Sequence, residues 1–159
     1  MKVIILAGGR GKRLRPITDK IPKPLILINK KPLIERTIKY LKKYGMTEII
    51  ISSGYKSNLI EKFLKKKKNF DCEITFSTEK TPLGTGGAIK KALRYVDEES
   101  FLVLNGDIVT NIDLKKILKK PNTIAANELK TKFGTMDIKN NKILKFNEKK
   151  DVTDVWMNP

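Results

Sequence analysis

The segment VIILAGGRGKRLRPITDKIPKPL, which begins at Val3, holds the residues best suited to chemistry. A short apolar run leads into a loop that contains Gly8, Gly9 and Gly11. Glycines let backbone N–H groups converge on an anion, because no Cβ blocks the approach. Basic side chains that could neutralise a polyphosphate stand among and after these glycines: Arg10, Lys12, Arg13, Arg15 and Lys23. The segment therefore predicts a loop that binds nucleotide phosphates.

Two better-known phosphate loops do not match this segment. A Walker loop requires GxxxxGK followed by Ser or Thr, whereas the order here is GGRGKRL. A dinucleotide-binding fold requires GxGxxG at the start of a helix, and Pro16, Pro22 and Pro24 prevent a long helix directly after the loop. The remaining alternative is a glycine turn with solvated surface charge.

The wording LAGGRGKRLRPIT followed by PKPL resembles the signature of the sugar-1-phosphate nucleotidyltransferases, also called nucleoside-diphosphate-sugar pyrophosphorylases. Molybdenum-cofactor guanylyltransferases share the LAGG start but lack the continuation. The resemblance implies the nucleotide-diphospho-sugar transferase fold. It also implies attack by a sugar-1-phosphate oxygen on the α-phosphorus of a nucleoside triphosphate, with release of pyrophosphate.

Composition restricts the classes of function. The 159 residues suit one domain, and a net charge of +17 favours acidic partners such as nucleotides and sugar phosphates. Without histidine, Ser-His and Cys-His catalysis are excluded, and a metal would need oxygen ligands, which favours Mg²⁺ or Mn²⁺. Cys72 is alone and is expected to fill space inside a strand. No N-terminal signal or membrane-spanning run is recognisable, so we expect a cytoplasmic protein.

Apolar runs alternate with amphipathic helical patterns through the first two thirds of the chain. Strands are expected at residues 3–6, 48–52, 74–77 and 101–104, with helices at 32–44, 59–64 and 88–93. The lysines at 65–68 would close the second helix. The pattern predicts an α/β fold with a mostly parallel, Rossmann-like sheet covered by helices on both faces. Short β segments are expected around 133–138 and 143–146.

Ligands of such sheets bind beyond the carboxyl ends of the strands. Both the glycine loop and Asp107, in LNGD, follow predicted strands, so both should reach one crevice. The resemblance implies that Arg13 grips the leaving pyrophosphate, that Lys23 meets the α-phosphate and that Asp107 binds Mg²⁺. It also assigns loop residues to nucleotide binding: Leu6, Ala7, Gly8, Gly9 and Gly11.

The resemblance places recognition of the base in EKTPLGTGGAI, at Glu79, Gly84 and Thr85. A carboxylate can accept the N1–H and N2–H groups of guanine together, whereas uracil and thymine offer one imide N–H. The PLGTGGAI wording also resembles guanylyltransferases that act on mannose or heptose phosphates. GTP is therefore the favoured substrate, and UTP or dTTP is the alternative.

Four residues toward the end of the chain match sugar-phosphate-binding positions of the family: Gly134, Glu148, Lys149 and Asn158. In the implied EKP motif, Glu148 binds a sugar hydroxyl and Lys149 binds the sugar phosphate, although Lys150 replaces the usual proline. We expect one nucleotidyltransferase domain over 1–159, with a nucleotide-binding part at 1–110 and the start of a sugar-binding part at 111–159.

The family has a second metal-binding aspartate in a later segment, and it has no counterpart here. The sequence is therefore expected to be either a fragment of a longer enzyme, which we favour, or a shortened relative that binds a nucleotide or sugar phosphate without efficient turnover. Binding of nucleic acid through the positive charge is a third reading, and no recognisable motif supports it. The sequence leaves the sugar and the oligomeric state open.

Overall fold

A computed structural model describes residues 1–128, 135–147 and 156–157 of the chain. It divides into two compact units, Met1–Ile112 and Asp113–Pro159. Among the described residues, no helix combines the length and the apolar character needed to cross a bilayer.

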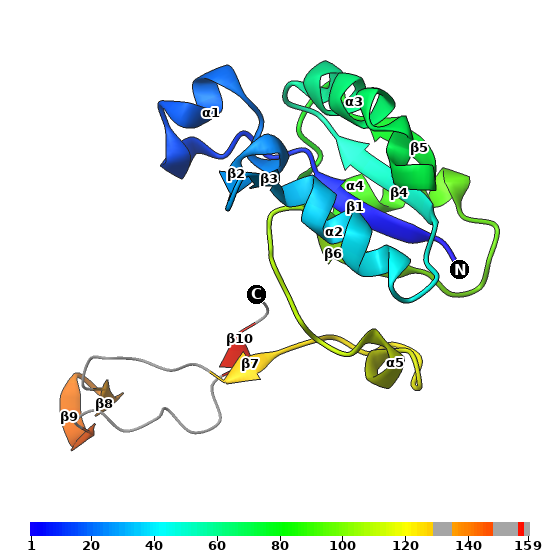
Figure 1. Cartoon of the computed structure of the whole chain (residues 1–159). Coiled ribbons are helices and arrows are strands. Elements are labelled where there is room, and N and C mark those ends of the chain that lie inside the picture. Colours follow the sequence, from blue (N-terminus) through cyan, green and yellow to red (C-terminus); the bar gives the residue numbers. More distant parts are fainter. Residues whose placement is uncertain (129–134, 148–155, 158–159) are drawn as a thin grey trace. The chain divides into compact units, whose positions relative to one another are not determined.

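A four-stranded sheet forms the centre of the first unit, in the order β5-β4-β1-β6 (Figure 1). All three neighbouring pairs are parallel. The strands are β1 (Val3–Ala7), β4 (Glu48–Ser53), β5 (Glu73–Thr78) and β6 (Leu102–Asn105). These bounds confirm the predicted parallel α/β fold, and each strand agrees with its sequence-based range to within one residue at either end.

The order of the strands shows where the chain reverses direction across the sheet. From β1 the chain moves outward to β4 and then to β5, and it next returns past both to place β6 on the other side of β1. Crossovers between parallel strands are right-handed. The helices of the two outward crossovers therefore lie on one face of the sheet, and the helix of the returning crossover lies on the other. Ligand crevices in open parallel sheets form at such a reversal, outside the carboxyl ends of the strands. Here that point lies after β1 and β6.

Three helices connect these strands: α2 (Leu33–Lys42), α3 (Ser57–Lys66) and α4 (Gly84–Ala92). Figure 1 shows α2 and α3 on one side of the sheet and α4 on the other. On the α4 side, Ile4, Ile50 and Ala92 form a buried cluster. Because strand side chains alternate between faces, Ile5 and Ile51 face the other way, where α2 and α3 bury Ile34, Ile38, Leu41, Ile60 and Leu64.

The helix ends follow the local signals in the sequence. After α2 the chain turns at Gly45, which has a φ of +73° that favours glycine. The lysine run lies at the end of α3 as predicted, and Lys65 pairs with Glu61 one turn earlier at 2.8 Å. Single 3₁₀ turns occur at η1 (Lys12–Leu14), η2 (Lys23–Leu25), η3 (Lys68–Asp71) and η4 (Leu93–Tyr95), and a short hairpin joins β2 (Leu27–Ile28) to β3 (Lys31–Pro32).

The position of Cys72 corrects one expectation from the sequence. Cys72 is buried, but it lies between η3 and β5 and not inside the strand, which begins at Glu73. The local reason is that η3 extends through Asp71, so Cys72 serves as its C-terminal cap residue. Burial raises the pKa of the Cys72 thiol.

Within its described residues, the second unit contains a short helix and two small antiparallel pairs of strands. The helix is α5 (Leu114–Ile117), and Asp113 caps it by accepting a hydrogen bond from the Lys115 amide at 3.1 Å. One pair joins β7 (Asn127–Glu128) to β10 (Trp156–Met157), and the other joins β8 (Thr135–Lys139) to β9 (Lys142–Asn147). Asn140 and Asn141 both have positive φ in the β8–β9 turn, as two-residue hairpin turns require. The expected β segments are thus present within the described residues.

Gly106 sets the contact between the end of β6 and β1. Its amide donates to the Leu6 carbonyl at 2.8 Å, and a Cβ at this position would meet that oxygen at 2.9 Å and Ile5 Cγ2 at 3.0 Å. We expect Gly106→Ala to lower the free energy of unfolding by about 1–3 kcal/mol, because overpacking forces the backbone to move. Urea unfolding measures this change.

Gly86→Ala is the matched control, since Gly86 lies inside α4 and a Cβ there has no heavy atom within 4 Å. Alanine should leave stability unchanged or raise it by about 0.5–1 kcal/mol, as expected for a helix interior. Equal stability of the two variants would contradict the close-approach argument.

Candidate active site

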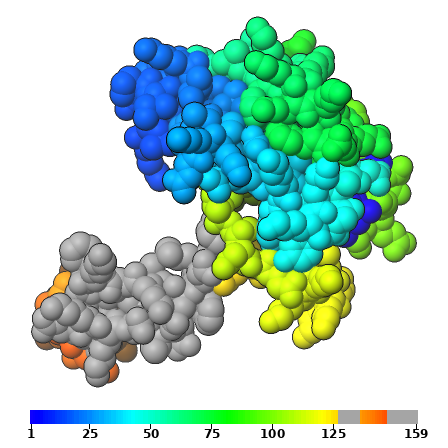
Figure 2. Space-filling view, in the orientation of Figure 1, coloured from blue at the N-terminus to red at the C-terminus, as the bar shows by residue number. Residues whose placement is uncertain are grey.

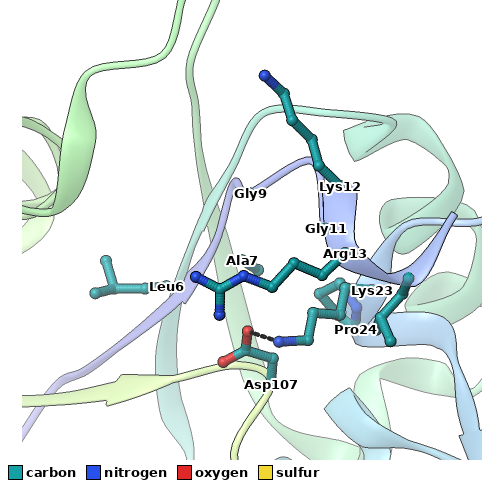
Figure 3. Close-up of a pocket in the computed structure, with 10 residues that line it drawn as sticks. Leu6, Ala7, Gly9, Gly11, Lys12, Arg13, Lys23, Pro24 and Asp107 are labelled. Atoms are coloured by element: carbon teal, nitrogen blue, oxygen red, sulfur yellow. Dashed lines mark hydrogen bonds and ion pairs between the residues drawn. The ribbon is translucent and has the colours of Figure 1, made fainter. Parts of the chain in front are cut away.

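A pocket of about 270 Å³ opens at the carboxyl ends of β1 and β6, where the sheet reverses direction. Three stretches of the first unit supply its walls: the loop after β1, the η2 turn and the residue that follows Gly106 (Figure 3). The pocket is lined by Leu6, Ala7, Gly9, Gly11, Lys12, Arg13, Leu14, Lys23, Pro24 and Asp107. The crevice predicted from the two strand ends is therefore a real cavity of the fold.

An ion pair crosses the floor of this pocket. Lys23 Nζ lies 2.5 Å from Asp107 Oδ2, and each side chain is 34% exposed. Lys23 begins η2 between two prolines, Pro22 and Pro24, whereas Asp107 is reached through the parallel pairing of β6 with β1. Residues separated by 84 positions are thus brought into contact.

The other cations of the loop differ in where they point. Figure 3 shows the Arg13 side chain extending over the Lys23–Asp107 pair, while Lys12 points away from it. Arg10 lies over the ring of Tyr55, with 5.8 Å from its guanidinium carbon to the ring centroid. Arg15 pairs with Asp19 at 3.2 Å. Of these four, Arg13 is the cation directed into the space above Asp107.

Thr18 holds the glycine loop in shape from inside the protein. Gly11 has a φ of +60°, and its carbonyl accepts a hydrogen bond from the buried Thr18 hydroxyl at 3.0 Å. The Thr18 carbonyl in turn accepts from the Tyr55 hydroxyl at 3.0 Å. Thr18 lies in α1 (Ile17–Lys20), so this helical turn connects the loop to the segment that follows β4.

The corner after β4 forms a second support for the loop. The Tyr55 amide donates to the Gly8 carbonyl at 3.3 Å, and a Cβ on Gly54 would meet that same oxygen at 3.3 Å. Lys56 donates to the carbonyls of Asp19 and Lys20, at the end of α1. Figure 2 shows the blue N-terminal part of the chain bordering the green part at the surface of this unit.

Glu79 lies next to the glycine loop but is not among the residues that line the pocket. Its amide continues the sheet by donating to the Ser53 carbonyl at 2.7 Å. Its carboxylate accepts from the Ser52 hydroxyl at 3.3 Å and from the Leu83 amide at 3.1 Å. A Cβ on Gly8 would lie 3.5 Å from Glu79 Oε1. The Glu79 carboxylate therefore lies beside Gly8, whose two chain neighbours, Ala7 and Gly9, line the pocket.

Most of the residues assigned from the sequence to nucleotide binding come together in the first unit. Leu6, Ala7, Gly9, Gly11, Arg13, Lys23 and Asp107 line one pocket, and Gly8 joins it to Glu79. Gly84 and Thr85 are the first residues of α4, and Gly84 has a φ of +68°. The four residues assigned to the sugar phosphate, Gly134, Glu148, Lys149 and Asn158, lie outside the described residues.

Several supporting residues carry no functional assignment from the sequence: Thr18, Ser52, Gly54, Tyr55, Lys56 and Gly106. The signal for Ser52 is a pair of serines, Ser52 and Ser53, directly after three isoleucines. Thr18 is the last residue of the RPIT motif, and sequence spacing indicates no role for its hydroxyl. Contacts between segments far apart in the chain define the roles of all six.

The donor set of the pocket suits a hard cation shared with a ligand. Asp107 is its one carboxylate, and no group of three or more acidic, Cys or His side chains that could hold a metal occurs among the described residues. Mg²⁺ commonly binds through one or two carboxylates together with substrate phosphates and water. Asp107 fits that pattern as the protein ligand to a cation that a triphosphate also binds.

Relatives with known names are similar to this chain over most of its length. A D-glycero-α-D-manno-heptose 1-phosphate guanylyltransferase from Aneurinibacillus thermoaerophilus is 38% identical over 157 residues, which cover 94% of this chain and 68% of that protein. An enzyme of the same name from Campylobacter jejuni is 47% identical over 117 residues, or 74% of this chain and 52% of its own length. The chain thus spans about half to two thirds of these two relatives.

Solved structures agree with the fold. HddC from Yersinia pseudotuberculosis, complexed with GMP-PN, matches with a TM-score of 0.74 and 35% identity over 93% of this chain and 69% of that one. A putative glucose-1-phosphate thymidylyltransferase from Bacillus anthracis matches with a TM-score of 0.72 and 28% identity, over 94% and 65%. The family model described as "Nucleotidyl transferase" matches residues 2–155. The chain therefore belongs to the nucleotidyl transferase family.

Proposed function

We propose that this chain carries the nucleotide-binding part of a sugar-1-phosphate guanylyltransferase, which converts GTP and mannose- or heptose-1-phosphate into a GDP-sugar and pyrophosphate. The observation that carries the proposal is the convergence of the glycine loop, Arg13, Lys23 and Asp107 in one pocket. The names of the relatives, heptose-1-phosphate and mannose-1-phosphate guanylyltransferases, support the choice of substrates. Nucleotides and sugar phosphates are cytoplasmic metabolites, so we place the reaction in the cytoplasm.

The proposed step needs no nucleophile from the protein. A phosphate oxygen of the sugar 1-phosphate forms a bond to the α-phosphorus of GTP, and the bond from that phosphorus to the bridging oxygen of the β-phosphate breaks. The electron pair leaves with pyrophosphate. The attacking oxygen is already an anion, so the protein contributes positioning and neutralisation of charge. A pocket without histidine suits this chemistry.

Lys23 and Arg13 are the cations that we assign to the triphosphate. Lys23 would meet the α-phosphate as negative charge builds there, and Arg13 would hold the departing pyrophosphate. In the free protein Lys23 pairs with Asp107. A partly exposed pair of this kind contributes only about 0–1 kcal/mol, so phosphate oxygens can replace the carboxylate at small energetic cost.

Asp107 is the residue that we assign to Mg²⁺ or Mn²⁺. When bound, the cation supplies charge neutralisation at the phosphates. Displacement of Lys23 from Asp107 frees one side chain for the cation and the other for the α-phosphate. When the substrate binds, the ion pair would therefore separate, with Asp107 binding the cation and Lys23 binding the α-phosphate.

Guanine is favoured because of the hydrogen-bonding capacity of Glu79. An ionised carboxylate offers about four acceptor positions, of which Ser52 and the Leu83 amide use two. The remaining two can accept the N1–H and N2–H of guanine. Uracil and thymine have one imide N–H and would leave one position empty. We assign Gly84 and Thr85 to the same base-binding region, and Gly134, Glu148, Lys149 and Asn158 to the sugar phosphate.

A panel of GTP, UTP, dTTP and ATP against mannose- and heptose-1-phosphate tests the proposed reaction through pyrophosphate release in the presence of Mg²⁺. We expect release with GTP in preference to the other triphosphates. A version extended at the C-terminus should be assayed in parallel. Equal or better use of UTP by both versions would contradict the guanine assignment, and nucleotide binding without turnover in both would favour a binding module.

Lys23→Met should lower the turnover number by about a hundred- to a thousandfold, the usual cost of losing one preorganised contact to developing charge. Asp107→Asn should abolish the stimulation of the reaction by Mg²⁺. Lys12→Met is the matched control, because Lys12 borders the same pocket but points away from the Lys23–Asp107 pair. A similar loss in Lys12→Met would indicate a general effect of charge instead of a specific contact.

Glu79→Gln should lower kcat/KM for GTP by about ten- to a hundredfold, as expected for loss of a hydrogen bond to a charged group. An amide presents one donor and one acceptor, which complement the N3–H and O4 of uracil, so use of UTP should fall less or rise. Glu73→Gln, at the exposed start of β5, is the control. An unchanged ratio of GTP to UTP use in Glu79→Gln would contradict the role of Glu79.

A further inference from the structure

Ser52 is a buried hydroxyl near the carboxyl end of the central strand β4. It stands in β4 directly after three isoleucines, and its side chain is 1% exposed. Burial of a hydroxyl costs free energy unless the group finds a partner. The partner of Ser52 is Glu79 Oε1, at 3.3 Å. The hydroxyl donates, because an ionised carboxylate can only accept.

The Leu83 amide completes the support of the same carboxylate. It donates to Glu79 Oε2 at 3.1 Å, from the turn just before α4. Leu83 itself is held closely over the first turn of α4, since a Cβ on Gly87 would meet Leu83 Cβ at 2.8 Å. Each oxygen of the Glu79 carboxylate thus has one donor within the protein, and the plane of the group is set by two separate elements.

Gly8 limits the remaining freedom of this carboxylate. A Cβ built on Gly8 would lie 3.5 Å from Glu79 Oε1 and 3.8 Å from its carboxyl carbon. The loop backbone therefore lies against the carboxylate on the side of the phosphate pocket. Contacts from β4, from the turn before α4 and from the glycine loop together restrict the orientation in which Glu79 can meet a ligand.

We propose that Ser52 is a positioning residue for base selection: its hydroxyl orients the Glu79 carboxylate so that both N–H groups on the guanine edge can be accepted at once. This inference rests on the proposed function, because it assumes that Glu79 reads the base. Ser52 does not touch the nucleotide. It acts through Glu79, and loss of its hydroxyl lets the carboxylate rotate away from the geometry that accepts two hydrogen bonds.

Ser77 is the matched control for this position. It is the direct partner of Ser52 in the parallel pairing of β4 with β5, so the two residues are neighbours on one face of the sheet. Ser77 is also fully buried, but its hydroxyl has no hydrogen-bond partner among the described residues. Ser52→Ala and Ser77→Ala therefore each remove one buried hydroxyl from neighbouring positions of the sheet, and only the first removes a hydrogen bond to Glu79.

Equilibrium binding of GTP and of inosine triphosphate by calorimetry tests the proposal, because inosine lacks the 2-amino group of guanine. We expect the unmodified protein to prefer GTP, and Ser52→Ala to reduce the ratio of the two affinities by about three- to tenfold, because a misoriented carboxylate keeps only part of its hydrogen bond to the 2-amino group. Ser77→Ala should leave the ratio unchanged. Ser52→Thr, which keeps the hydroxyl, should retain the preference.

A general structural defect would weaken binding of both nucleotides equally and leave the ratio intact, so the ratio separates positioning from stability. An unchanged ratio in Ser52→Ala, or an equal fall in Ser77→Ala, would overturn the role of Ser52 while the guanine proposal stands. If the unmodified protein bound UTP as tightly as GTP, the guanine proposal itself would fail, and the role of Ser52 with it. Binding is measured without turnover, so the test does not depend on catalysis.

Discussion

The parallel pairing of β1 with β6 is the contact on which the site depends. It places the glycine loop and Asp107 at the same end of the sheet, although about a hundred residues separate them in the chain. The pairing continues one step past β6, where the Gly106 amide donates to the Leu6 carbonyl. Only glycine allows this approach without displacement of the backbone. The position of Asp107 is therefore decided by backbone packing.

The electrostatics of the pocket combine a general and a local effect. The net charge of +17 attracts anions to the whole protein and accelerates their encounter with it. The local arrangement is more selective, because Asp107 pairs with Lys23 while Arg13 lies over the pair and Arg10 and Arg15 are engaged elsewhere. An acidic residue in a strongly basic region suits a ligand that is itself accompanied by a divalent cation.

Polar groups on β4 and after it connect the two halves of the proposed nucleotide site. Tyr55 and Lys56 hold the glycine loop and the α1 turn, whereas Ser52 contacts the carboxylate that we assign to the base. The corner at the end of one central strand thus supports both ends of the proposed nucleotide.

The sequence by itself determined the parallel α/β class and the order of strands and helices, and it predicts a phosphate-binding role for the glycine loop. These features are local: apolar runs, helical spacing, glycines and prolines act within a few residues of one another. The lysine run at the end of α3 and the turn at Gly45 were predictable for the same reason. The misplacement of Cys72 by one residue shows the usual uncertainty at the boundary of an element.

Tertiary structure alone decided which of these groups meet. Segments that are distant in the chain, or folded back on one another, are joined by the Lys23–Asp107 pair and by the hydrogen bonds of Thr18 to Gly11 and of Ser52 to Glu79. Close approach of two such segments also explains why glycine is needed at positions 54 and 106. Sequence spacing carries no signal for such contacts, because they depend on strand register and on which face each helix covers. The residues that perform the proposed chemistry could be named from the sequence, but those that hold them in position could not.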